Sequence, residues 1–400
     1  MNPSQSKAAI FFSCLGHLYI HLFTAVFFVI VLALEQDWQL PYHELIKSWT
    51  LASILLGVVA LPAGLLSDRI GARTMMVIFF IGMGLSSIAA GYTQTPQGLV
   101  IAMAGIGAFA AIYHPVGIPW LVRNTSSAQG KALGFNGIFG SMGTASAALV
   151  AGYLIDIASW RMAFIVPGVV SVVTGVWLWV MVVTNRVVEG SGAATKKTST
   201  SHHDFIRAGA ILLTCMFLAG MVYHSTQTAL PKVFDLRRDG LIGDSTFGVG
   251  LLVATVYAIA GIMQIIGGHL ADRYPLKLVY LGTLIIQIPL LYLASSAGGL
   301  VLMMTATLMV MSGVAALPAE NMLLARYTPA HRHGLMFGLK FVLGFGAAPL
   351  ALQLVSYYDK HSAGVQNIFV LLSVLALCAW GIAMLLPRAK FAPIPAGVGD

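Results

Sequence analysis

The amino-acid sequence predicts an all-α membrane protein with twelve transmembrane helices, arranged as two pseudo-symmetric six-helix bundles. Composition is the first observation behind this prediction. Of the 400 residues, 58% are hydrophobic and only 9% are charged, and the mean hydropathy is +0.86, as is typical of a chain whose solvent is lipid. The second observation is that the apolar runs fall into two groups of six. The third is that one short charged motif occurs at the same place in both groups.

Each apolar run is long enough for a helix that crosses the membrane, which takes about 20 residues. The N-terminal bundle is predicted for residues 1–184, with helices near 8–34, 48–66, 73–92, 97–122, 131–155 and 161–184. The C-terminal bundle is predicted for residues 207–400, with helices near 207–231, 247–270, 277–297, 298–325, 334–357 and 365–387. The polar stretch 185–206 between them predicts a flexible cytoplasmic linker.

The first apolar run is interpreted as a membrane helix and not as a cleaved signal peptide, because it carries two histidines and lacks a small-residue cleavage site. Lysine and arginine are retained on the cytoplasmic side of membrane proteins. If both termini are cytoplasmic, fifteen of the 22 bases lie inside, six lie outside, and Lys340 falls within a predicted helix. The sequence therefore predicts a multi-pass protein of the inner membrane with both termini in the cytoplasm.

The net charge of +8 is what positive inner loops produce, and it does not indicate a nucleic-acid partner. Three cysteines, Cys14, Cys215 and Cys378, are scattered among apolar runs. Their positions give neither a disulfide framework nor the spacing of a metal site.

The repeated charged motif lies between the second and third runs of each half. Its first copy reads Gly-Leu-Leu-Ser-Asp-Arg-Ile-Gly-Ala-Arg, and its candidate gating residues are Gly64, Asp68, Arg69, Gly71 and Arg73. Glycine permits the backbone angles of a tight reversal between two helices. The acid is predicted to cap a helix N-terminus or to pair with an arginine across the interface between the bundles.

The second copy contains Gly268, Asp272 and Arg273 at the same spacing, with Pro275 at the second glycine position and Lys277 at the last arginine position. The repeat continues further along the chain. Pro115 aligns with Pro318, Arg123 with Arg326 and Thr125 with Thr328, and after one inserted residue Gly130 aligns with Gly334 and Gly134 with Gly338. Duplicated bundles around a site near the membrane midplane are the plan of many secondary transporters.

The Gly-x-x-x-Asp-Arg motif and its degenerate second copy resemble the signature loop of the major facilitator superfamily. This resemblance covers nearly the whole chain and implies transport by alternating access. A narrower stretch, Ala111–Pro115 followed by Gly134–Gly140, is similar to the fosmidomycin-resistance branch of exporters. The sequence departs from the patterns of these exporters at two places. Val116 occupies the position of a glutamate in that branch, and Gly143-Thr144 stands where many proton-drug antiporters have Gly-Pro.

Glu320 is the one acid predicted to lie well inside a membrane helix. It precedes Arg326 by six residues, and Lys340 follows Gly334 by six residues, so each lies roughly 9 Å from the cytoplasmic end at about 1.5 Å rise per residue. A Glu320–Lys340 ion pair between the tenth and eleventh helices is therefore predicted. It either exchanges a proton and binds an anionic substrate, or only fixes helix packing.

His17 and His21 are four residues apart and share one face of the first helix. They are candidates for proton relay or substrate binding, with helix packing as the alternative. Two histidines supply at most half of a metal site, so no metal site is predicted. A membrane metalloenzyme or metal carrier built on them remains the hypothesis from another functional class.

Three further residues complete the predicted substrate and proton pathway. His114 precedes Pro115, whose ring is expected to kink the fourth helix. His224 lies in the most polar stretch of any predicted span and is expected to face His21 across the cavity. Asn136 in the fifth helix matches Lys340 in the repeat, whereas Gln264 and Gln287 are weaker candidates.

Together these features predict a secondary active transporter and not an enzyme, with no cofactor. Its expected partners are a small organic solute, anionic or zwitterionic, protons as the coupling ion and the lipid bilayer, and it is expected to act as a monomer. No nucleotide-binding loop is visible, so a gradient supplies the energy. A proton-coupled exporter of drugs or toxic metabolites is the alternative.

Overall fold

The computed structural model describes residues 3–125, 129–190, 202–329 and 332–387, and all regular structure within them is helical. Eleven of the described helices are long and apolar enough to cross a membrane, and a pair bent by 46° makes a twelfth span. The predicted all-α class and the twelve spans are confirmed.

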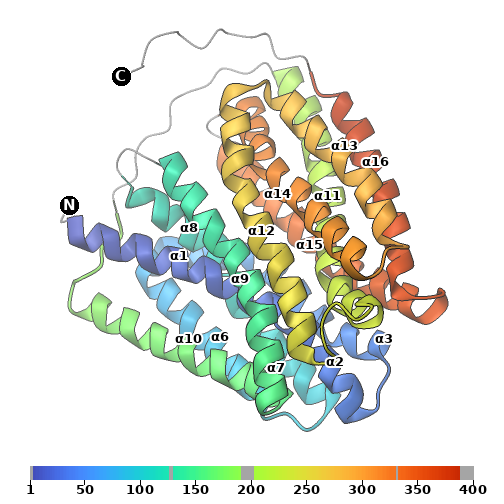
Figure 1. Ribbon diagram of the computed structural model, residues 1–400. Helices are drawn as coiled ribbons and strands as arrows, with labels where there is room; N and C mark the ends of the chain where they lie inside the picture. The colour runs from blue at the N-terminus through green and yellow to red at the C-terminus, as the bar shows by residue number, and fades with distance from the viewer. Residues whose placement is uncertain (1–2, 126–128, 191–201, 330–331, 388–400) are drawn as a thin grey trace.

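The first six spans form the N-terminal bundle, on the left of Figure 1. They are α1 (Pro3–Ala25) with α2 (Phe27–Trp38); α3 (Tyr42–Leu45), η1 (Ile46–Trp49), α4 (Thr50–Val58) and α5 (Ala60–Ile70); α6 (Ala72–Gly91); α7 (Pro96–Ala110) with α8 (Tyr113–Arg123); α9 (Gln129–Ile157); and α10 (Trp160–Val183).

The last six spans form the C-terminal bundle beside it (Figure 1). They are α11 (His202–Arg237), α12 (Thr246–Arg273), α13 (Leu276–Ala294), α14 (Gly299–Tyr327), α15 (His333–His361), and η3 (Val365–Asn367) with α16 (Ile368–Met384). The observed bounds follow the predicted ones closely. The clearest difference is α11, which begins at His202, inside the stretch predicted as linker.

Two of the spans are broken at a place that a proline explains. A proline lacks the N–H that would bond the carbonyl four residues earlier. The second span bends between Val58 and Ala60, four residues before Pro62. The fourth span breaks at Ala111 and Ile112, and Ala111 is four residues before Pro115. This interruption lies where the kink in the fourth span is predicted, and it leaves His114 in the first turn of α8.

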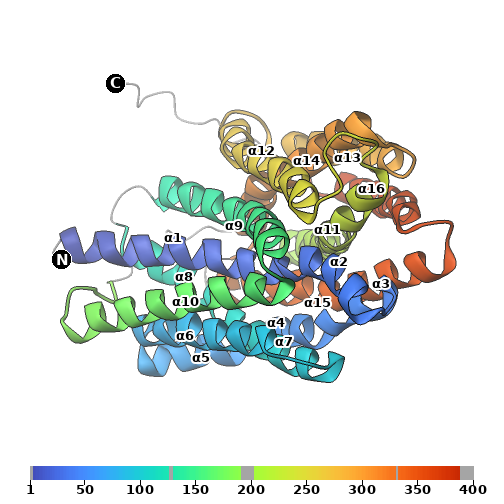
Figure 2. The same ribbon diagram turned by 60° about the horizontal axis from the view of Figure 1, so that its bottom comes forward.

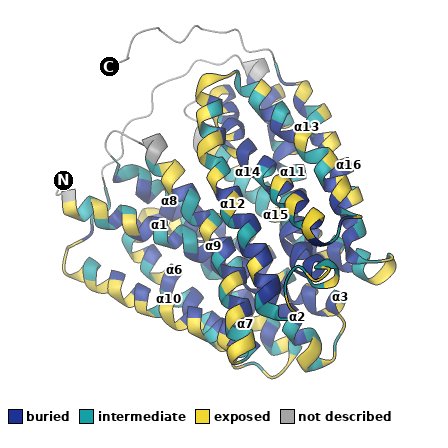
Figure 3. Cartoon of the chain, in the orientation of Figure 1, coloured by how far each residue is buried: buried dark blue, intermediate teal, exposed yellow. Residues whose placement is uncertain are grey.

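Exposed residues lie along the outward faces of the outer helices (Figure 3), and many of them are large and apolar. Val173 and Trp177 on α10 are exposed, as are Ile286 and Tyr292 on α13. Large contiguous apolar surface of this kind is unfavourable in water, and here it provides the faces that contact lipid. The buried faces of the same helices hold each bundle together.

The first signature loop is organised by a residue outside the motif. Glu189, which follows α10, accepts hydrogen bonds from the backbone N–H groups of Ala72 and Arg73 and from the Arg73 side chain, at 2.9–3.2 Å. It therefore caps the N-terminus of α6. Gly71 adopts φ +89°, and a Cβ there would lie 2.6 Å from a Glu189 carboxylate oxygen. The expectation that Gly71 supplies an unusual backbone conformation is confirmed.

The expectation for Asp68 was wrong. Asp68 is exposed, and no hydrogen bond or ion pair joins it to any of the described residues. The cap comes from Glu189 because the chain after α10 turns back across the start of α6. Arg73 binds the Val187 carbonyl at 3.0 Å, and Trp120 binds the Val188 carbonyl at 2.9 Å.

The structure also differs from the flexible linker predicted for residues 185–206. Residues 185–190 dock on the N-terminal bundle and are not a free tether, while residues 191–201, including Lys196 and Lys197, lie outside the described residues. The second bundle repeats this docking. Lys277 at the start of α13 donates to the carbonyls of Met384 and Leu386, at 2.7 and 2.6 Å, just as Arg73 at the start of α6 binds the chain after α10.

The two bundles are tied together at the end of the molecule away from the signature loops. Lys232 on α11 pairs with Glu35 on α2 at 2.6 Å. The Tyr42 hydroxyl donates to the Thr228 carbonyl at 3.0 Å, and His43 Nδ1 lies 3.6 Å from the Asp359 carboxylate. Figures 1 and 2 both show α2 and α3 beside α11 and α15 at this end. This end of the interface is closed.

Candidate functional site

Three histidines meet in the N-terminal bundle. His17 and His21 lie one turn apart on α1, and His114 reaches them from the first turn of α8. One ring nitrogen from each residue lies within 4.8 Å of one from each of the others. The ring centroids are 5.0 Å apart for His17 and His21, 5.6 Å for His17 and His114, and 6.0 Å for His21 and His114. All three residues are candidates from the sequence, but the sequence did not predict that they form one cluster.

Asn136 and Tyr113 hold this cluster in place. His17 Nδ1 lies 2.6 Å from the Asn136 carbonyl oxygen, and since a carbonyl only accepts, Nδ1 is the donor. The Tyr113 hydroxyl donates to the Asn136 side-chain oxygen at 2.9 Å. The Tyr113 ring also stacks on His17, with centroids 5.0 Å apart and planes inclined by 14°. Asn136 therefore orients a histidine, besides being a polar residue at the predicted place.

Close helix contact makes this arrangement possible. A Cβ added at Gly140 on α9 would lie 2.8 Å from His17 Nε2, and one at Gly143 would lie 2.2 Å from the Leu18 carbonyl oxygen. Both glycines let α9 approach α1, because small residues allow close contact between membrane helices. Gly137 instead faces α12, where Gln264 donates to the Gly137 carbonyl at 3.2 Å.

The predicted ion pair is present in the C-terminal bundle. Lys340 Nζ lies 2.9 Å from Glu320 Oε1 and 2.5 Å from Asn321 Oδ1. Glu320 is buried, and its other oxygen accepts a hydrogen bond from the Tyr280 hydroxyl at 3.1 Å. The contact inferred from the depth of the two residues is confirmed. Tyr280 and Asn321 were not among the candidates from the sequence, because their contacts with the ion pair depend on how α13 and α15 pack against α14.

The histidine cluster and the ion pair meet across the interface between the bundles. The His114 ring packs on the rings of Phe341 and Phe345 of α15, with centroids 5.1 and 5.2 Å away. His114 is also close enough to Lys340 for an electrostatic interaction. Two groups of polar side chains, one from each bundle, thus face each other at the interface between the bundles.

The remaining candidates differ in whether they reach the interface between the bundles. His224 is close enough to His21 for an electrostatic interaction, and its ring contacts the backbone of Gly344 on α15. Gln264 bridges the two bundles, binding Gly137 and Ser141 of α9 at 3.2 Å. Gln287 binds the Met309 carbonyl within the C-terminal bundle at 3.1 Å, so it serves helix packing and does not reach the interface.

The other signature-loop candidates lie toward the ends of α5 and α12, at the end of the molecule where the linker docks. Gly64 is the nearest of them to the cluster along α8, since a Cβ there would lie 3.5 Å from Pro115, the neighbour of His114. Only Gly71 and Arg73 of the first copy make the specific contacts with the chain after α10. The loop residues therefore fix the ends of the helices.

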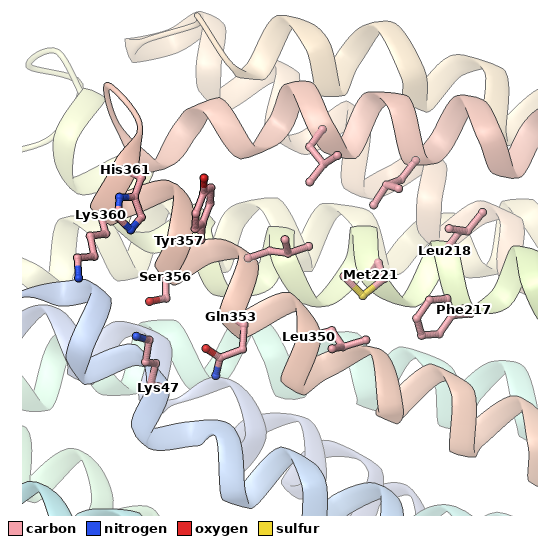
Figure 4. Close-up of a pocket in the computed structure, with 13 residues that line it drawn as sticks. Lys47, Phe217, Leu218, Met221, Leu350, Gln353, Ser356, Tyr357, Lys360 and His361 are labelled. Atoms are coloured by element: carbon pink, nitrogen blue, oxygen red, sulfur yellow. The ribbon is translucent and has the colours of Figure 1, made fainter.

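A cavity of about 670 Å³ lies elsewhere, between η1, α11, α15 and α16. Figure 4 shows Lys47, Lys360 and His361 at one end of it and Phe217, Leu218 and Met221 toward the other. Most of its lining is apolar, and it contains none of the predicted pathway residues. We place the candidate site at the histidine cluster and the ion pair, because ionisable groups inside a membrane protein are costly and mark functional paths.

Comparison with known proteins agrees with the duplicated fold. Residues 13–243 and 241–397 each match the sequence profile of the Major Facilitator Superfamily. The chain belongs to this superfamily. Membership of this superfamily supports transport of a small molecule and not an enzymatic function. The resemblance inferred from the signature loop is thereby confirmed.

Three curated relatives illustrate the range of functions in the superfamily. The chain is 30% identical over 178 residues to a probable 4-methylmuconolactone transporter of Cupriavidus pinatubonensis, over 42% of this chain and 41% of that protein. It is 28% identical to the cephamycin export protein CmcT of Amycolatopsis lactamdurans, over 41% and 34%. It is 25% identical to the putative multidrug resistance protein MdtD of Yersinia enterocolitica, over 52% and 47%. Each match spans about half of the relative or less.

Solved structures match over almost the whole chain. A bacterial homologue of the human lysosomal transporter Spinster, in an inward-facing and occupied conformation, has a TM-score of 0.76 and 14% identity, over 96% of this chain and 97% of that one. The unoccupied form has a TM-score of 0.73 and 13% identity, over 98% and 99%. These similarities establish the fold.

Proposed function

We propose that this transporter moves a small organic anion or zwitterion across the inner membrane by alternating access, coupled to protons. The observation that carries the proposal is the buried Glu320–Lys340 pair at the interface between the bundles. Maintaining two charges inside a membrane protein costs free energy unless each is paired. A pair close to a residue of the opposing bundle, as Lys340 is to His114, is well suited to exchange partners during a transport cycle.

The contacts of Lys340 suggest how solute and proton are coupled. Its ammonium group is held by two oxygens, Glu320 Oε1 and Asn321 Oδ1. A carboxylate on the solute competes with Glu320 for the ammonium group. The displaced Glu320 is then an unpaired buried charge, and uptake of a proton removes that charge. Tyr280 remains hydrogen-bonded to the glutamate side chain throughout.

The histidines supply the opposite wall of this site. His114 lies near Lys340, and His21 lies near His224. Neutral imidazoles donate and accept hydrogen bonds, so they can bind polar groups of a solute without adding fixed charge. The cluster of bases favours an anionic or zwitterionic solute over a lipophilic cation, for which more acids are expected.

The closed end of the interface supports one conformation of this cycle. With both termini in the cytoplasm, the Glu35–Lys232 and His43–Asp359 contacts lie on the outer side, which supports a state closed to the outside. We propose a division into bundles near residues 184 and 207, with residues 185–190 docked on the first bundle and the start of α11 preceding the second. In intact cells, an impermeant maleimide is expected to label Asp244→Cys but not Asp68→Cys in a cysteine-free background, and labelling of Asp68→Cys would refute this topology.

A proton-coupled exporter of drugs or toxic metabolites is the second candidate. The names of the relatives favour it, since two of those described above are an export protein and a putative multidrug resistance protein. The aromatic rings of Phe341 and Phe345 against His114 would suit an apolar solute. Loss of drug resistance on deletion, with no uptake of organic anions, would favour this candidate.

Solute-driven proton movement in proteoliposomes tests the first candidate. A panel of organic anions is screened with the parent protein, Glu320→Gln, Lys340→Gln and the double variant. We expect proton flux with the parent only, and retained solute exchange with Glu320→Gln. Asp244→Asn is the control, because Asp244 pairs with Arg238 at an exposed loop. Proton-coupled transport that survives in each single variant would contradict the proposal.

A further inference from the structure

The histidine cluster provides more ligand atoms than transport of an organic solute requires. His17, His21 and His114 each offer one ring nitrogen, and these three atoms lie within 4.8 Å of one another. We infer that this cluster is a binding site for a late first-row divalent transition metal, such as Zn²⁺, Co²⁺, Ni²⁺ or Cu²⁺. The inference stands apart from the proposed coupling through Glu320 and Lys340.

The orientation of His17 is that of a metal ligand. Its Nδ1 donates to the Asn136 carbonyl oxygen at 2.6 Å, so the lone pair is on Nε2. Histidines that bind metals commonly donate their second ring N–H to a carbonyl or carboxylate, which fixes the tautomer and the ring orientation. Tyr113 adds a second restraint, because it stacks on the His17 ring and binds the Asn136 side chain.

His114 provides an independent observation. Its Nδ1 is buried and has no hydrogen-bond partner among the described residues. A buried polar atom without a partner is destabilising, so such atoms usually have a bound ion or water. Coordination of a metal through this nitrogen would satisfy it. The ring itself is held by Phe341 and Phe345 on one side and by His17 and His21 on the other.

The donor set determines which metals fit. Three imidazoles with neither a carboxylate nor a thiolate in the cluster favour borderline cations over Mg²⁺ and Ca²⁺, which prefer oxygen ligands. A three-histidine site leaves one coordination position for water or another ligand. Sequence analysis predicted no metal site, because two histidines four residues apart are insufficient. The packing of α8 against α1 brings the third histidine to them.

Metal titration of the purified protein without a histidine tag tests this inference. We expect one Co²⁺ per chain to bind with the visible absorption of a nitrogen-ligated tetrahedral ion, and Zn²⁺, but not Mg²⁺, to displace it. Each of His17→Gln, His21→Gln and His114→Gln should weaken binding at least about tenfold, since loss even of residues that only orient a ligand costs 10–100-fold. His361→Gln is the control, because His361 is exposed and distant in the fold.

Two measurements on the parent protein guard against variants that fail to fold. Zn²⁺ should protect the three cluster histidines, but not His361, from carbethoxylation mapped by mass spectrometry. Its affinity should also fall as the pH is lowered, because protons compete for the imidazole nitrogens. Absence of saturable one-to-one binding in the parent, or equal protection of His361, would overturn the inference.

Discussion

At the residue scale, the first signature loop depends on one glycine. Gly71 lies at φ +89° and ψ +150°, a region that residues with a side chain rarely adopt. A Cβ there would also lie 2.6 Å from the carboxylate that caps α6. The motif therefore has two reasons for glycine at this position, the backbone conformation and the close approach of Glu189.

Replacing Gly71 by alanine should destabilise the protein by roughly 1–3 kcal/mol, because the new side chain is strained in this backbone region. The midpoint of thermal unfolding in detergent measures this. Gly268→Ala is the matched control, because Gly268 is helical and a Cβ there meets nothing within 4 Å. The control should be neutral or more stable. An unchanged midpoint for Gly71→Ala would show that the loop relaxes without cost.

At the element scale, the ends of the helices are fixed by residues that follow the sixth span of each bundle. Glu189 caps α6, and Arg73 binds the Val187 carbonyl. In the second bundle, Lys277 binds the carbonyls of Met384 and Leu386 at the end of α16. Arg73 and Lys277 occupy the same position of the repeat. Each binds backbone carbonyls at or just after the end of the sixth span of its own bundle.

Glu189→Ala should cost about 0.5–2 kcal/mol of stability, the usual effect of losing an N-terminal cap. Asp68→Ala should leave stability unchanged, since Asp68 is exposed and has no partner among the described residues. Chemical denaturation monitored by tryptophan fluorescence can compare the two variants. The assignment of the cap to Glu189 would be refuted if Asp68→Ala were the more damaging change.

At the scale of the whole molecule, one end of the interface between the bundles is closed by polar contacts. The Glu35–Lys232 pair and the Tyr42–Thr228 hydrogen bond join α2 and α3 to α11, and the His43–Asp359 pair joins α3 to α15. These contacts must break if the opposite conformation is to form. They therefore set part of the equilibrium between the two states of the cycle.

Glu35→Gln should weaken this closure by about 1 kcal/mol, which changes the ratio of the two states roughly fivefold. Spin labels at Glu44→Cys and Lys360→Cys, both exposed and on opposite bundles, report the separation. We expect a second, longer distance to become populated. Arg238→Gln, whose ion pairs stay within one bundle, should leave the distance distribution unchanged. If Glu35→Gln left it unchanged too, the pair would play no part in closure.

The sequence by itself determined the class, the spans and the family. Hydrophobicity over about 20 residues is a local property, so it predicts each membrane helix without knowledge of the others. The signature motif and the kink before Pro115 are local in the same sense. The Glu320–Lys340 contact could also be predicted, because an unpaired buried charge is costly and two opposite charges at equal depth on neighbouring helices can pair.

Only the tertiary structure decided which polar residues act together. His114 is about 100 residues from His17 and His21, and the packing of α8 against α1 brings their rings together. The same holds for Glu189, which reaches α6 only because the chain after α10 folds back, and for Tyr280, which contacts Glu320 through the packing of α13 on α14. Helix periodicity specifies the face on which a residue lies, but the partner of that face depends on how separate helices pack.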